Sequence, residues 1–185
     1  MDHFEYVMVI VSIILGLSLT QVLRGLSKLA RSAQPSVIVV LWAFLLFLLH
    51  LQVWWAFWDL NQVKLWTQFY FVFVALIPCT LFGMTELLMP MASKPDTRWE
   101  DHFLSIRLWF FRLFLFFIVV AILETWLILK VPLTHPYRGI QTFMFGLGAL
   151  GLLTTNLRVH RWIVVAVIVC MIFAQVAFRL LPGLR

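Results

Sequence analysis

Apolar residues fill this chain in long stretches, and polar residues gather in the short segments between them. Most stretches contain about 20 residues, the length that an α-helix needs to cross the hydrocarbon core of a bilayer. The pattern therefore predicts an all-α, polytopic membrane protein: one bundle of about six transmembrane helices over residues 1–185 with no soluble domain. The predicted spans lie near residues 4–26, 37–60, 66–89, 106–129, 137–153 and 162–181.

The connecting segments contain residues that favour helix ends. Pro35 precedes the second stretch, Pro90 follows the third and Pro136 stands at the start of the fifth. Proline has no backbone N–H, so it fits outside a helix or in its first turn. Thr97 followed by Glu100 matches a capping box. We therefore expect the fourth helix to begin ahead of its apolar stretch.

Composition supports a membrane location. Hydrophobic residues make up 63% of the chain and charged residues 12%, with a mean hydropathy of +1.00. Because soluble domains carry roughly 25% charged residues, this inventory cannot cover a water-facing surface. The net charge of +6 comes from Lys and Arg near span ends, where topology and lipid headgroups account for them. The predicted partner is thus the lipid bilayer, and no nucleic acid.

The distribution of Lys and Arg predicts an orientation. The larger set lies at one end of the spans: Arg24, Lys28, Arg31, Lys94, Arg98, Arg107, Arg158 and Arg161. The smaller set lies at the other end: Lys64, Lys130, Arg138, Arg179 and Arg185. Because cytoplasmic loops are enriched in Lys and Arg, we expect both termini outside a bacterial inner membrane. The tripeptide Asp-His-Phe at residues 2–4 recurs at 101–103, which suggests a 3+3 inverted repeat.

Several polar residues lie inside the predicted outer half of the spans. Burying a carboxylate in hydrocarbon costs several kcal/mol, so such a group is expected to face the bundle interior. We predict that His50 and Glu124 form a proton-exchanging pair and that Gln52, Gln141 and Gln175 line an outward cavity. The same side chains could instead serve only as hydrogen-bonding contacts between helices. The sequence leaves both interpretations open.

Two further features predict helix contacts. Glu86 and Arg112 lie near the inner ends of the third and fourth spans, which a short connector makes antiparallel neighbours. We expect them to form an ion pair that fixes the two helices or closes the inner side. Ser12, Gly16 and Thr20 follow one another at four-residue spacing. Such a stripe of small residues favours close helix contact, within the chain or between copies.

The sequence contains no recognised catalytic or metal-binding spacing. Cys79 and Cys170 lie inside apolar stretches, where we expect them to act as small apolar side chains. No metal or other cofactor is predicted, and nothing points to an enzyme. The leading hypothesis is a small channel or secondary transporter for protons or small polar solutes. One alternative is a non-catalytic subunit or scaffold that binds a membrane protein or a second copy; a weaker one is a haem or quinone redox subunit.

Overall fold

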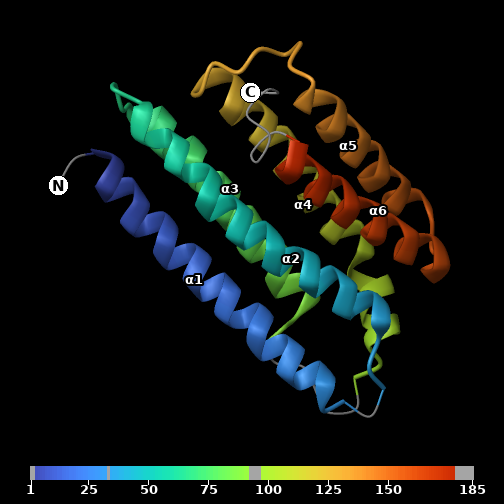
Figure 1. The fold of residues 1–185 in the computed structure, drawn as a ribbon. Helices are drawn as coiled ribbons and strands as arrows, with labels where there is room; N and C mark the ends of the chain where they lie inside the picture. The colour runs from blue at the N-terminus through green and yellow to red at the C-terminus, as the bar shows by residue number, and fades with distance from the viewer. Residues whose placement is uncertain (1–2, 33, 92–96, 178–185) are drawn as a thin grey trace.

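Six α-helices and one 3₁₀-helix form the part of the chain that the computed structural model describes, residues 3–32, 34–91 and 97–177 (Figure 1). They are α1 (His3–Ala30), α2 (Val37–Ala56), η1 (Phe57–Gln62), α3 (Gln68–Leu88), α4 (Trp99–Leu127), α5 (Tyr137–Leu153) and α6 (Leu157–Gln175). These ranges contain no β-strand. The predicted all-α class is confirmed.

Five of these helical segments are long and apolar enough to cross a membrane: α1, α2 with η1, α3, α4 and α6. Helix α5 has 17 residues and falls short of the usual span length of about 20. Large apolar side chains such as Leu17, Trp55 and Trp162 are more than half exposed around the bundle, as a lipid-facing surface requires. The fold is that of a multi-pass helical membrane protein. The count of about six crossings and the 3+3 repeat stay predictions.

The helix ends differ in detail from those predicted. Helix α4 begins ahead of its apolar stretch as expected, but its N-cap is Arg98, which makes no side-chain capping bond. The capping box expected from Thr97 therefore does not begin the helix. Helix α6 begins at Leu157, earlier than the predicted residue 162, because Asn156 accepts a hydrogen bond of 2.9 Å from the Arg158 N–H. The predicted end at residue 181 lies outside the described residues.

Helix α2 lies at the centre of the bundle and contacts α1, α3, α4 and α6. On one side, α1 packs against α2 and α3 along an edge of the molecule (Figure 1). On the other, α5 and α6 pack against each other, and α5 also packs against α4. Helices α3 and α4 also pack against each other, so the two sides of the bundle are joined both through α2 and through this contact.

A cluster of aromatic rings fills the core between α2 and α4. The Trp42 ring meets Phe110, Phe111 and Phe114 edge-on, with centroid distances of 4.9, 5.3 and 5.8 Å. All four side chains are fully buried, and we call them the aromatic layer. Edge-to-face contacts of this kind add about 0.5–1.5 kcal/mol each beyond the burial of apolar area. Glycines let α5 approach this layer: a Cβ added at Gly151 would lie 2.5 Å from Phe111 Cζ.

Candidate functional site

A cavity of about 430 Å³ lies between α2, α4, α5 and α6. Its walls come from the end of α2 with η1, the end of α4, the beginning of α5 and the end of α6, all at one end of the bundle. The volume falls within the range of about 300–1,000 Å³ that is usual for small-molecule sites. Apolar side chains form most of the lining, and its polar residues are Gln52, Asp59, Glu124, Thr125, His135, Tyr137, Gln141 and Gln175.

Glu124 is the most deeply buried carboxylate of the described residues. It lies in the last turn of α4, and only 6% of its surface is exposed. Spacing of three and four residues puts it on the same helix face as Phe117 and Ala121, which also line the cavity. It makes no hydrogen bond or ion pair with the described part of the chain, although the charge of Asp59 acts on it electrostatically. The cavity therefore contains a buried acidic group without a compensating partner.

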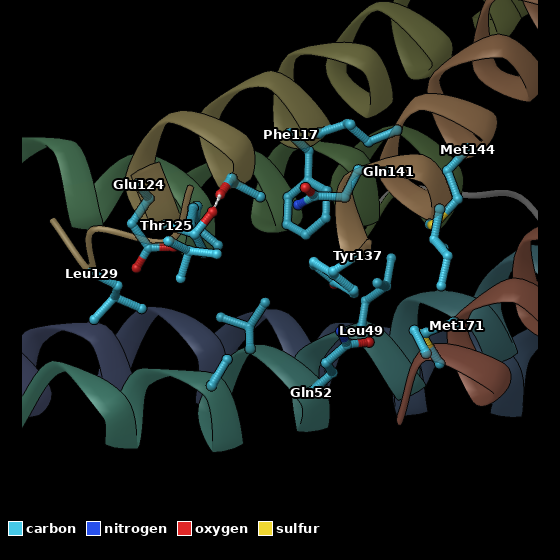
Figure 2. Close-up of a pocket in the computed structure, with 18 of the residues that line it drawn as sticks. Leu49, Gln52, Phe117, Glu124, Thr125, Leu129, Tyr137, Gln141, Met144 and Met171 are labelled. Carbon is cyan, nitrogen blue, oxygen red and sulfur yellow. Dashed lines mark hydrogen bonds between the residues drawn. The ribbon is translucent and has the colours of Figure 1, made fainter. Parts of the chain in front are cut away.

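The cavity has two chemically different ends. Figure 2 shows Glu124 and Thr125 at one end, and Met144 and Met171 at the other. Gln52, Gln141 and Tyr137 lie between these ends in the same view. A ligand along the cavity would therefore meet an acidic, hydrogen-bonding region at one end and a polarisable, apolar region at the other.

All three glutamines that the sequence singled out line this cavity with Glu124. The Gln141 carbonyl oxygen accepts a hydrogen bond of 2.8 Å from Arg138, so its amide N–H groups remain available as donors. The Gln52 carbonyl oxygen is buried and has no hydrogen-bond partner among the described residues. Four helices thus contribute a polar side chain to one space, and transport through it remains a proposal.

Arg138 is a residue whose importance the sequence analysis missed. It was counted only among the basic residues at the outer end of the spans, but it is buried in the first turn of α5 and 8% exposed. Its guanidinium donates to Thr125 Oγ1 at 2.7 Å, to Gln141 at 2.8 Å and to the Val131 carbonyl at 3.1 Å. These bonds tie the end of α4, the following connector and α5 together. The available signal was the three-residue spacing to Gln141, which puts both side chains on one helix face.

His50 does not face the cavity. Its Nδ1 donates to the Leu46 carbonyl at 2.6 Å, and its Nε2 is hydrogen-bonded to Ser18 Oγ of α1, also at 2.6 Å. Ser18 Oγ is in turn 3.1 Å from Thr85 Oγ1 of α3. His50 thus belongs to a buried network between α1, α2 and α3, whereas Glu124 lies in the cavity on the other side of α2. The structure does not bring the expected proton-exchanging pair together.

Glu86 and Arg112 also have separate partners. Glu86 accepts a hydrogen bond from Gln21 of α1, whose amide also donates to the Met89 carbonyl at 3.1 Å. The Arg112 guanidinium lies over the Trp109 ring of its own helix, 4.9 Å from the centroid. The ion pairs between described residues are Arg98–Asp101 and Arg161–Glu100. The two helices are neighbours as expected, but close packing rather than the Glu86–Arg112 pair joins them.

The stripe of Ser12, Gly16 and Thr20 is partly exposed, with open space beside Gly16. A Cβ added at Gly16 would meet no atom within 4 Å, and the Thr20 hydroxyl donates back to the Gly16 carbonyl at 2.8 Å. Helix α1 instead packs through another face, which includes Leu15 and Val22. The stripe makes no close contact within the described residues, so the expectation of a contact between copies stays a prediction.

The aromatic layer lies next to the cavity. Phe114 precedes the lining residue Phe117 by about one helical turn, and Trp42 precedes Leu49 by about two. His160 of α6 extends the layer by stacking on Phe111 at 5.3 Å, and its Nε2 donates to the Thr154 carbonyl at 3.0 Å. Fully buried rings therefore fill the bundle next to the cavity, so the cavity does not continue past them.

Metal coordination finds no support in the geometry: the described residues contain no group of three or more His, Cys, Asp or Glu side chains that could hold a metal ion. The two cysteines are separate and free, with Cys79 exposed on α3 and Cys170 half-buried on α6.

Comparisons of the chain with known protein families, with curated proteins and with solved structures find no match. Functional inference therefore rests on the cavity.

Proposed function

We propose that this chain is a small channel or secondary transporter for protons or small polar solutes, and that the cavity is its solute site. The observation that carries the proposal is the meeting of Glu124 and three glutamines, contributed by four helices, in one space. A membrane bundle does not retain an unpaired buried carboxylate without cost, because transfer from water to hydrocarbon is expensive. A proton or a bound solute would compensate that cost.

The cavity and the aromatic layer together suggest a site accessible from one side. The Lys and Arg bias favours the outside of a bacterial inner membrane for the cavity end and for both termini. In this arrangement, Glu124 exchanges protons or binds solute, and Gln52, Gln141 and Gln175 hydrogen-bond the solute from the walls. Passage inward requires the packed rings around Trp42 to move apart. A rearrangement of helices against each other is the usual route in transporters.

The proposal assigns proton exchange to Glu124 rather than to His50. Both ring nitrogens of His50 are already hydrogen-bonded, so this side chain stabilises the contact between α1 and α2. The same geometry gives little support to haem ligation, since neither nitrogen is available to an iron. Glu86, bound by Gln21, is assigned a structural role between α1 and α3.

Flux measurements on proteoliposomes test this function. Vesicles containing the purified chain and a pH-sensitive dye would be given a proton gradient, and a panel of small polar solutes would be added in turn. We expect a proton or solute flux that Glu124→Gln reduces at least about tenfold, because an intramembrane acid in a solute path is functional. The matched control is Glu100→Gln, on the same helix, whose carboxylate is 43% exposed and pairs with Arg161. It should leave the flux unchanged.

Two outcomes contradict the proposal. One is a wild-type chain that conducts neither protons nor any solute of the panel. The other is a flux that Glu124→Gln and Glu100→Gln alter equally, since that would remove the cavity carboxylate from the path.

A non-catalytic membrane subunit is the second candidate function. It is favoured by the exposed stripe on α1, where Gly16 leaves room for a close neighbour that the chain itself does not supply. Purification of a stoichiometric membrane partner, together with no flux from the isolated chain, would support this alternative.

A further inference from the structure

We propose that the cavity binds an organic monocation, a protonated amine or guanidinium on an apolar body, with its charged head at Glu124 and its body toward Met144 and Met171. This inference rests on the proposed function in one respect: it names the solute class of the same site. It is tested by binding, so that it can fail independently of transport.

The charge of the cavity lining favours a cation. Glu124 is buried in the cavity wall without a hydrogen bond or ion pair from the described residues. The described lining contains no Lys or Arg. Arg138 lies behind it, with Thr125 and Gln141 as partners. A buried carboxylate is best compensated by a cation that brings its own hydrogen-bond donors.

Acceptor oxygens in the cavity lining favour a ligand that brings hydrogen-bond donors. The Glu124 carboxylate can only accept hydrogen bonds when ionised, and the buried Gln52 carbonyl oxygen has no donor among the described residues. A protonated amine or guanidinium offers several N–H donors and no competing acceptor at its charged end. Such a head group beside Glu124 would donate to the carboxylate, whereas a carboxylate or phosphate ligand would leave it unpaired.

The size and shape of the cavity favour an elongated organic molecule. Its volume of about 430 Å³ exceeds the space that a proton or a bare inorganic ion needs and suits a molecule of small-ligand size. Two methionines at the end away from Glu124, together with Phe117 near the middle, provide a polarisable apolar lining (Figure 2). A solute with one charged end and one apolar end fits this division along its length.

Isothermal titration calorimetry on the detergent-purified full chain tests the inference with three ligands of matched skeleton. These are phenylbutylammonium, the neutral phenylbutanol and the anionic phenylbutyrate, each corrected for uptake by empty micelles. We expect the wild type to bind the ammonium at least about tenfold more tightly than the other two, equivalent to about 1.4 kcal/mol. Glu124→Gln should abolish this preference, and Glu124→Asp should retain most of it because the charge remains.

Control variants separate charge from folding. Glu100→Gln, on the same helix and outside the cavity, should bind all three ligands as the wild type does. If Glu124→Gln fails to fold, Ala121→Phe provides a second test. It fills the cavity without changing a charge and should abolish binding of the ammonium.

The inference is overturned if the wild type binds phenylbutyrate or phenylbutanol as tightly as the ammonium. It is also overturned if Glu124→Gln or Ala121→Phe, shown to be folded, keeps the preference for the cation. Flux in vesicles without this preference would leave the proposed transport standing and remove the cation assignment. A clear binding preference for the ammonium without any flux would support the cation assignment and contradict the proposed transport.

Discussion

Replacement of Gly151 by alanine tests the close contact between α5 and Phe111 of α4. The added Cβ would lie 2.5 Å from Phe111 Cζ, closer than carbon atoms approach without displacement. The ring cannot simply rotate away, because Trp42, Phe110 and His160 pack around it at centroid distances of 5.3, 5.6 and 5.3 Å. Overpacking of a filled core costs about 1–3 kcal/mol, and such confinement places the cost in the upper part of that range.

The same helix supplies a control for this substitution. Gly146 also lies on α5, but a Cβ there would meet nothing within 4 Å. Both replacements gain about 0.8–1.0 kcal/mol from the higher helix propensity of alanine. This gain cancels when the two variants are compared. We therefore expect Gly151→Ala to be less stable than Gly146→Ala by about 2–3 kcal/mol, which is the overpacking cost alone.

Unfolding in mixed micelles with increasing dodecyl sulfate, followed by the near-ultraviolet circular dichroism of the packed aromatic side chains, would give the two free energies. Loss of the aromatic signal at a lower dodecyl sulfate fraction in Gly151→Ala is the expected result. Equal stability of the two variants would refute the reasoning. It would mean that α5 does not pack tightly against Phe111.

Two further predictions concern the other helices. Ser18→Ala removes the partner of His50 Nε2 and should destabilise the bundle by about 0.6–1.7 kcal/mol, the range of interhelical hydrogen bonds in membranes. In the same unfolding assay, the control Ser12→Ala should cost less than about 0.5 kcal/mol, as expected away from such contacts. Equal effects of the two substitutions would contradict the hydrogen-bond network around His50. With Cys79 and Cys170 replaced by alanine, Gln62→Cys should react with a membrane-impermeant maleimide in intact cells, and Arg31→Cys only after lysis. The reverse pattern would invert the proposed orientation.

The positions of the helices could be predicted because each one needs a long apolar stretch, a local property of the sequence. Helix α5 occupies Tyr137–Leu153, the predicted range, because Pro136 precedes it and the apolar stretch ends before Thr154. The N-terminal ends of α4 and α6 were harder to place, since polar residues precede the apolar stretch in both. Hydropathy alone does not mark these ends: the side chain of Asn156 caps α6, whereas Arg98 at the start of α4 makes no side-chain capping bond.

The rotation of each helix could not be predicted from hydropathy. Helix α2 is apolar on all its faces, so no amphipathic pattern indicates which side faces α1 and which faces α4. One signal was nevertheless present: His50 and Gln52 are two residues apart, which places them about 200° apart around a helix. They could not both face one cavity. The structure assigns Gln52 to the cavity and His50 to Ser18.

The polar groups inside the bundle include a hydrogen-bonded network between helices and a set of cavity-lining groups without donors in the described part of the chain. Ser18, His50 and Thr85 hydrogen-bond one another, so together they stabilise the contacts of α1 with α2 and α3. Glu124 and the Gln52 carbonyl oxygen, both in side chains that line the cavity, lack partners among the described residues. An unsatisfied buried polar group destabilises a fold by about 1–3 kcal/mol, more for a charge. At the cavity, a ligand that supplies the missing donors would offset this cost upon binding.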